Sequence, residues 1–257
     1  MCKRSIMKRK FLSIVLCLSM LLSLLTLASC SDKNNPPDGS GTNPPAAETE
    51  SIAILYENDV HCAVDGYSKL AAMKAELKGV YDHVGVVSSG DFVQGGTLGA
   101  VSKGEYIINL MNKVGYDAIA LGNHEFDYQL ARLSELNNLS NTKFLSCNFA
   151  KVGEDKSYFD SYTIVSYGDV EIAYIGITTP STISSSNPAQ FKNEDGEIIY
   201  TFNEAEMYSL VQANIDAAEK AGADYVIALS HVGYDESDEL FDITDIIENT
   251  DGFDVVL

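Results

Sequence analysis

The stretch "DAIALGNHEFD", residues 117–127, joins a short apolar run to a crowded polar loop. Residues 118–121 are typical of a buried strand, and Gly122 ends the run. The polar side chains that follow are Asn123, His124, Glu125 and Asp127. A Gly-Asn pair after a strand is an ordinary turn signal. The carboxyl end of a strand is also where open α/β sheets place their active sites, so the other strand ends must decide between these two interpretations.

Outward from this stretch, the chain alternates between predicted strands and helices. Apolar runs predict strands at residues 52–56, 83–90, 117–121, 142–149, 224–233 and 253–257, and a hairpin at 162–177. Apolar residues at helical spacing predict helices at 67–79, 104–115, 129–139, 202–222 and 236–250. This alternation predicts an α/β fold with a largely parallel sheet that helices cover on both faces.

Four of the predicted strands carry Asp, Asn or His just beyond their carboxyl ends. These residues are Asp59 and His61, then Asp91, then Asn123 and His124, and finally His231. His83 begins a strand, so we expect it at the opposite edge of the sheet. Each residue alone is more often a turn, cap or hydrogen-bonding residue. Because parallel strands bring their carboxyl ends to one edge, the residues together predict a metal site.

The types of ligand narrow the choice of metal. Imidazole, carboxylate and carboxamide groups without a thiolate suit Zn, Mn, Fe, Co or Mg. A structural zinc site would use cysteines, and Cys62 beside His61 is a single thiol. Cys62 and Cys147 would form a disulfide only if their Cα atoms lay within about 7 Å, and we expect two buried thiols instead.

Four segments in this order resemble a known family. They are "NDVH" at 58–61, "SSGD" at 88–91, "GNHEFD" at 122–127 and "SHVG" at 230–233. Together they resemble the calcineurin-like metallophosphoesterases, and more closely the secreted 5′-nucleotidases and 2′,3′-cyclic-nucleotide phosphodiesterases. The resemblance covers residues 51–257. It implies an α/β sandwich of two mixed sheets flanked by helices, in α/β/β/α layers.

The resemblance also implies a role for each site residue. Asp59 and His61 would hold one of two divalent ions, Asp91 would bridge both, and Asn123 and His231 would hold the second. His124 would face the phosphate and assist departure of the leaving oxygen, while Asp127 would orient His124. The implied reaction is hydrolysis of extracellular nucleotides, by attack of a metal-bound hydroxide on the phosphoester.

Two features depart from the family pattern. Cys62 stands where a glycine is usual after the motif histidine, and the chain stops where the family continues into a Gly-His-x-His segment. We therefore expect a C-terminally incomplete phosphoesterase domain that is nearly inactive by itself. One alternative is a hydrolase of the same fold for a cyclic nucleotide, a sugar nucleotide or a thiosulfate ester. A non-catalytic solute-binding lipoprotein is another, but it would not need His and Asp at four strand ends.

The N-terminal residues predict export and a lipid anchor. A basic start, an apolar run and "LASC" at 27–30 predict a lipoprotein signal peptide over 1–29, with lipid on Cys30. A permanent transmembrane anchor is the alternative, since the run approaches spanning length. Residues 30–50 are rich in Pro and Gly and predict a tether between the membrane and the domain at 51–257. These features place the protein outside the cytoplasm, on a bacterial cell membrane.

The charge of the chain excludes one class of partner. The formal net charge is −20, from 17 basic and 37 acidic residues. Removal of the signal peptide would take five basic residues with it, leaving 12 against 37 and a net charge of −25. A basic surface for nucleic-acid polymers is therefore not expected. The positive charge that meets an anionic substrate would come from the metal ions.

Overall fold

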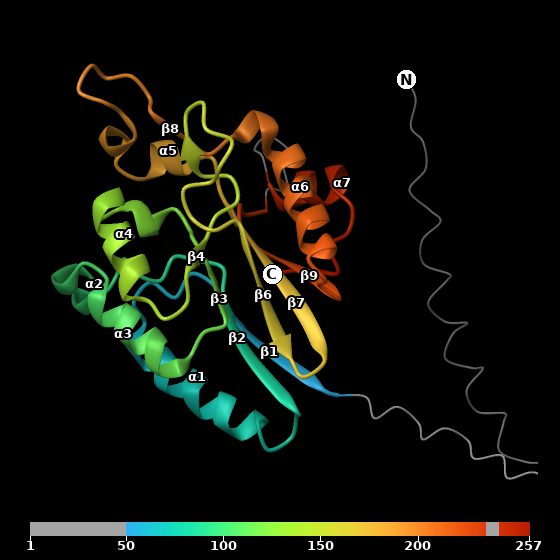
Figure 1. Cartoon of the computed structure of the whole chain (residues 1–257). Helices are drawn as coiled ribbons and strands as arrows, with labels where there is room; N and C mark the ends of the chain where they lie inside the picture. The colour runs from blue at the N-terminus through green and yellow to red at the C-terminus, as the bar shows by residue number, and fades with distance from the viewer. Residues whose placement is uncertain (1–49, 235–241) are drawn as a thin grey trace, which may run out of the picture. The chain divides into compact units, whose positions relative to one another are not determined.

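The computed structural model describes residues 50–234 and 242–257 and contains two four-stranded sheets (Figure 1). The first sheet has the order β1-β2-β3-β4, and all its strands are parallel. Its strands are β1 (Ile52–Glu57), β2 (His83–Ser88), β3 (Ala118–Ala120) and β4 (Phe144–Leu145). Parallel pairing brings the carboxyl ends of these strands to the same edge, where the polar loops follow.

The second sheet is mixed and has the order β10-β9-β7-β6. Its strands are β6 (Tyr162–Tyr167), β7 (Val170–Thr178), β9 (Tyr225–His231) and β10 (Val255–Val256). The predicted hairpin forms the antiparallel pair β6–β7, whereas β7–β9 and β9–β10 are parallel. A small antiparallel pair joins β5 (Ala150–Lys151) to β8 (Tyr200–Thr201).

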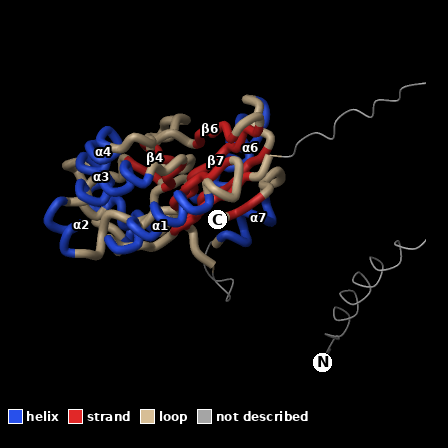
Figure 2. Tube along the Cα trace, turned by 90° about the horizontal axis from the view of Figure 1, so that it is seen from below, coloured by secondary structure: helices blue, strands red, loops and turns tan. Residues whose placement is uncertain are grey.

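Helices cover the outer face of each sheet, so the layers run α/β/β/α (Figures 1 and 2). On the first sheet lie α1 (Val64–Leu77), α2 (Thr97–Ser102), α3 (Glu105–Val114) and α4 (Leu130–Leu139). On the second lie α6 (Met207–Lys220) and α7 (Ile243–Asn249). Short elements are α5 (Thr182–Ser185) and the 3₁₀ helices η1 (His124–Phe126), η2 (Pro188–Phe191) and η3 (Glu204–Glu206).

The inner faces of the two sheets pack against each other. Val87 and Leu145 of the first sheet share a buried cluster with Tyr174 and Leu229 of the second. Tyr167 donates a hydrogen bond to the Asp117 carboxylate at 3.3 Å, which links β6 to the start of β3. The packing confirms the sandwich that the family resemblance implies. The alternation of strands and helices alone predicts one parallel sheet. It does not reveal which strands pair with each other, and therefore does not reveal the division into two sheets.

Some predicted elements begin or end elsewhere. Residues 236–241 of the helix expected over 236–250 lie outside the described residues. The described part forms α7 from Ile243, where extended Asp242 caps the helix by accepting hydrogen bonds from the Thr244 and Asp245 N–H groups. The strand expected over 142–149 is shortened to β4. Cys62 and Cys147 are both buried free thiols, as predicted.

The features predicted for the N-terminal segment lie outside the described residues. These are the signal peptide at 1–29, the lipid site Cys30 and the tether up to residue 49. Within residues 50–234 and 242–257, no helix has the length and apolar character needed to cross a membrane.

Candidate metal centre

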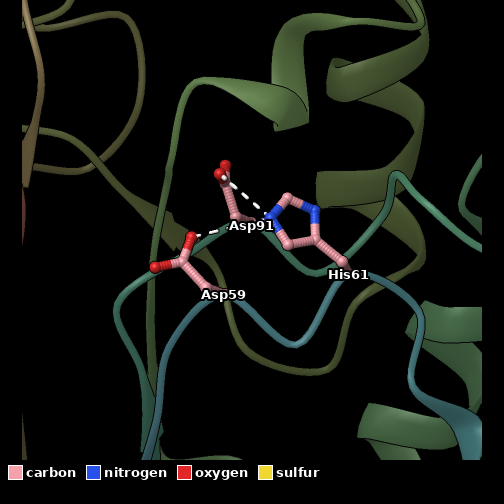
Figure 3. A group of neighbouring side chains, drawn as sticks. All are labelled: Asp59, His61 and Asp91. Atoms are coloured by element: carbon pink, nitrogen blue, oxygen red, sulfur yellow. Dashed lines mark ion pairs between the residues drawn. The ribbon is translucent and has the colours of Figure 1, made fainter.

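The loops that follow β1 and β2 interlock through their backbones at the edge of the first sheet. The Asp59 N–H donates to the Gly90 carbonyl at 3.2 Å, and the His61 N–H donates to the Asp91 carbonyl at 2.9 Å. Each loop therefore fixes the height and direction of the other. The result is that Asp59, His61 and Asp91 project toward a common point, as Figure 3 shows.

These three side chains form a compact group of potential ligands. One ligand atom from each lies within 4.8 Å of the others. His61 Nε2 is 3.7 Å from Asp59 Oδ1 and 3.8 Å from Asp91 Oδ2. The Asp59 side chain is 53% exposed and that of Asp91 only 4%, so the group is closed toward the core and open toward solvent.

His231 reaches the same point from the second sheet, at the end of β9. Its Nε2 is 3.3 Å from Asp91 Oδ2 and 4.0 Å from Asp59 Oδ1. Two imidazoles from different sheets thus approach the same pair of carboxylate oxygens. In contrast, His83 begins β2 at the opposite end of the sheet, where its Nε2 lies 3.5 Å from Glu50 Oε2.

The donor set fits divalent metal ions. Two carboxylates converge here, and the only ion-pair partners of Asp59 and Asp91 among the described residues are histidines. A neutral imidazole offers a lone pair, and a carboxylate offers charge and oxygen donors, which is the combination that Zn, Mn, Fe and Co accept. A cation between these groups would remove the repulsion between the two carboxylates.

The backbone at this point is strained. Asp59, His61, Cys62 and Asp91 have φ angles of 54°, 43°, 61° and 57°, in the left-handed region that non-glycine residues rarely adopt. Each such residue costs about 1–3 kcal/mol and persists only where its surroundings enforce the conformation. Here the interlocked loops enforce it. Three of the four strained residues are the predicted metal ligands, and such strain is typical of functional sites.

Cys62 does not face the ligand group. Its Sγ donates to the Phe92 carbonyl at 3.4 Å, and the side chain belongs to the core beneath the helices of the first sheet. Burial raises the pKa of this thiol, which disfavours the thiolate that a metal would need. Cys62, where a glycine is usual in the family pattern, therefore adds a side chain to the hydrophobic core.

The loop after β3 brings Asn123 and His124 to the same edge. The His124 N–H donates to Asp91 Oδ1 at 2.9 Å, which places His124 beside the ligand group. His124 Nδ1 lies 2.7 Å from Asp127 Oδ2 one turn along η1, and the rings of His124 and His61 are 5.2 Å apart. Asn123 precedes η1 and is half-buried. The predicted site residues therefore all occur at one edge of the sandwich.

Hydrogen bonds and charge shift the pKa values of this cluster. Burial lowers the pKa of His124, but the Asp127 hydrogen bond and the Asp91 carboxylate outweigh burial and raise it. Burial likewise lowers the pKa of His231, and the bond to Asp91 reverses this effect. The pKa of Asp91 is raised by burial and lowered more strongly by His231 and the His124 N–H, so it lies below the usual value.

Glu125 is a central residue of the site that the sequence analysis did not assign. Its side chain is fully buried and accepts hydrogen bonds from four backbone N–H groups. These donors are Asp91 at 2.7 Å, Phe92 at 2.8 Å, Val93 at 3.2 Å and Gly122 at 2.8 Å. One carboxylate thus joins the loop after β2 to the loop after β3. A glutamate within a polar loop is expected to be exposed to solvent. Only its burial in the structure reveals that it joins the two loops.

Two glycines allow the same loops to touch. A Cβ on Gly90 would overlap the Gly122 backbone, and Gly90 has a φ of +109°. A Cβ on Gly122 would overlap the Asp91 carboxylate, with only 2.8 Å to Asp91 Cγ. Asp91 therefore packs directly onto the backbone of the neighbouring loop.

Comparison with known proteins places this geometry among phosphoesterases. The sequence profile of the family described as "Calcineurin-like phosphoesterase" matches residues 52–257. The chain is 31% identical over 236 residues to the snake venom 5′-nucleotidase of Gloydius brevicauda, covering 82% of this chain and 37% of that protein. It is 30% identical over 235 residues to the 5′-nucleotidase of Bos taurus, covering 83% and 38%. The chain thus spans less than two fifths of the length of these relatives.

A solved structure shares the fold. The calcineurin-like phosphoesterase YfkN from Bacillus subtilis superposes with a TM-score of 0.67 and is 23% identical in sequence. The superposition covers 80% of this chain and 71% of the YfkN chain.

Proposed function

This chain belongs to the calcineurin-like phosphoesterase family, and from that premise we propose that it is a two-metal phosphohydrolase acting on extracellular nucleotides. The observation that carries the proposal is the convergence of Asp59, His61, Asp91 and His231 on one point, with the His124–Asp127 pair beside it. Phosphate hydrolysis needs both concentrated positive charge and a proton donor for the leaving oxygen. This edge of the sandwich offers groups for each.

We propose that the ligands divide into two sets that share Asp91. Asp59 and His61 would hold one ion, and Asn123 and His231 the other. When bound, two divalent ions supply the charge that stabilises the phosphoryl group and the acidity that activates a water molecule. Asp59 Oδ1 lies closer to His61 Nε2, at 3.7 Å, than to His231 Nε2, at 4.0 Å, which supports this division. Zn, Mn, Fe, Co and Mg all remain compatible with the donors.

We propose that His124 is the proton donor. His124 Nδ1 lies 2.7 Å from Asp127, so the proton on that nitrogen is engaged in a hydrogen bond. Nε2 is therefore the nitrogen that can donate a proton to the substrate. Asp127 also fixes the direction of the ring and stabilises the imidazolium form. Donation to the leaving oxygen would avoid expulsion of an alkoxide. His124 contacts Asp91 through its backbone N–H, so this contact uses neither ring nitrogen.

The substrate class follows from the relatives. Two of them are named 5′-nucleotidases, which supports a nucleoside monophosphate as the substrate. A cyclic nucleotide, a sugar nucleotide or a thiosulfate ester would present similar chemistry to the same centre. The acidic composition supports a substrate attracted by bound ions, and it argues against nucleic-acid polymers as partners.

We further propose that the protein is a bacterial lipoprotein outside the cytoplasm. The signal pattern at 1–29 and Cys30 in "LASC" support export and a lipid anchor, and the Pro- and Gly-rich residues 30–50 would form the tether. We also propose that the 257-residue chain alone turns over slowly. Each ion would receive only three side-chain ligands from the predicted set, which leaves much of its coordination to water.

A substrate panel tests the proposed reaction. The protein, loaded with Mn²⁺ or Zn²⁺, is assayed for phosphate release from a nucleoside 5′-monophosphate, and in parallel on a 2′,3′-cyclic nucleotide, a sugar nucleotide and a thiosulfate ester. We expect the monophosphate to give the highest kcat/KM. Activity that persists after the ions are chelated would contradict the two-metal proposal. A higher kcat/KM for one of the other esters would show that this ester, and not the monophosphate, represents the substrate class.

A further inference from the structure

Asn58 connects the two proposed ligand sets, although it lies outside both. It follows the last residue of β1 and precedes Asp59. Its amide reaches Asp59 on its own loop and His231 at the end of β9 in the other sheet. Among the contacts of the described residues, this amide directly joins a side chain of each proposed ion site.

The partners determine the orientation of the amide. An ionised carboxylate only accepts hydrogen bonds, so the Asn58 amide nitrogen must face Asp59 Oδ2, at 2.6 Å. The amide oxygen then faces His231 Nδ1 at 3.2 Å. Because this oxygen accepts, His231 Nδ1 must carry the proton. The Ser89 carbonyl, 3.0 Å from the same nitrogen, requires the same tautomer.

This orientation prepares both neighbours for an ion. His231 with a proton on Nδ1 has its lone pair on Nε2, the atom that lies 3.3 Å from Asp91 Oδ2. Asp59 with Oδ2 engaged by Asn58 keeps Oδ1 for the ion, and Oδ1 is the oxygen near both His61 and His231. The side chains that Asn58 orients lie at the ends of strands in two different sheets.

We infer that Asn58 is a positioning residue that couples the two ion sites, by holding Asp59 and His231 at a set separation. The inference rests on the proposed two-metal function. Partners that orient metal ligands usually contribute tenfold to a hundredfold in metal affinity. Removal of the Asn58 amide is therefore expected to weaken the binding of both ions, because one amide supports a ligand of each.

Calorimetric titration with Mn²⁺ tests this inference in the complete, ion-free protein. Asn58→Leu has a similar volume and removes both hydrogen bonds, and we expect it to bind Mn²⁺ about tenfold to a hundredfold more weakly. Asn58→Ala serves if the leucine variant does not fold. Asn112→Leu is the matched control, because the Asn112 amide also makes two hydrogen bonds, to Leu139 and Asn141, on the outside of α3.

The outcomes separate the inference from the proposal beneath it. We expect Asn112→Leu to lower the melting temperature and leave Mn²⁺ affinity within about threefold of the wild type. If Asn58 contributed only to stability, its variants would behave in the same way as Asn112→Leu. A folded Asn58 variant that binds Mn²⁺ with wild-type affinity therefore overturns the inference. If the wild-type protein itself binds no Mn²⁺, the two-metal proposal fails and this inference fails with it.

Discussion

At the scale of single residues, the site depends on carboxylates that each have a different task. Asp91 lies close to both His61 and His231, the proposed histidine ligands, and also accepts a hydrogen bond from the His124 N–H. Asp127 holds only the His124 ring, and Glu125 holds only backbone. Because the tasks are separate, substitutions of these residues should have separable effects on turnover, metal content and stability.

The first prediction separates the proton donor from the ligands. His124→Ala should retain most of the bound metal and lose roughly 10²–10⁴ in turnover, the usual contribution of general acid catalysis. Asp91→Ala should lose metal as well, because Asp91 is the proposed shared ligand of both ions. Metal content measured beside the phosphatase rate checks both variants. Loss of the metals from His124→Ala would show that the imidazole is a ligand.

The second prediction concerns Glu125. In Glu125→Gln, an amide group would point at two backbone N–H donors, and two buried donors would lose their acceptor. The expected loss is about 2–6 kcal/mol in the free energy of unfolding, at about 1–3 kcal/mol for each unsatisfied donor. Urea denaturation measures it. Glu135→Gln on the exposed surface of α4 is the control, and an equally small effect in both variants would contradict the proposed role.

At the scale of elements, the site is built where loops from neighbouring strands touch. The loop after β2 and the loop after β3 approach so closely that Gly90 and Gly122 have no space for a Cβ. The four left-handed residues lie in the loops after β1 and β2, which are joined by the hydrogen bonds from the Asp59 and His61 N–H groups. The loops therefore act as one rigid unit that presents the predicted ligands.

The third prediction tests this close approach. The new methyl group in Gly122→Ala would overlap the Asp91 carboxylate, so we expect weaker Mn²⁺ binding and lower stability together. Calorimetric titration and thermal unfolding measure the two effects. Gly66→Ala on α1 is the control, since no atom lies within 4 Å of its added Cβ, and it should gain up to about 1 kcal/mol in stability. Unchanged metal affinity in Gly122→Ala would show that the loops can separate without cost to the site.

At the scale of the whole molecule, the metal centre lies where two sheets meet. Asp59, His61 and Asp91 belong to the first sheet, whereas His231 belongs to the second. The ion proposed to bind Asp91 and His231 would link the two halves of the sandwich. Ion binding and global stability should therefore change together.

The fourth prediction follows from this linkage. Saturation with Mn²⁺ at a hundredfold excess over Kd should stabilise the protein by about 2.7 kcal/mol for each site, and chelation should remove that gain. Thermal unfolding with and without EDTA measures the difference. Asp91→Ala should show almost no response to Mn²⁺. A wild-type melting temperature that is indifferent to the ion would argue against metal binding by the folded protein.

The fifth prediction concerns the anchor, which also belongs to the whole molecule. Cys30→Ser should abolish incorporation of labelled fatty acid, because the thiol is the proposed attachment point. The protein should then remain uncleaved or be released from the membrane. Labelled lipid on the Cys30→Ser protein would refute the assignment.

The sequence by itself determined the residue types and their placement at strand ends. Asp59, Asp91 and Asn123 could be predicted as site residues because strand patterns and the polar residues after them are local properties of the chain. The adjacency of His124 to Asn123, and of Asp127 one turn later, is also local. The α/β class follows from alternating periodicity in the same way.

Only the tertiary structure decided how the strands divide between two sheets. Nothing local separates β3 and β4 from β7 and β9, because strand pairing depends on packing between distant segments. The same reason explains why Glu125 and Asn58 escaped prediction. Burial makes Glu125 the acceptor for two loops, and the meeting of the sheets brings Asn58 to His231, 173 residues away along the chain. These roles arise from contacts between segments, so they exist only once the sheets have packed.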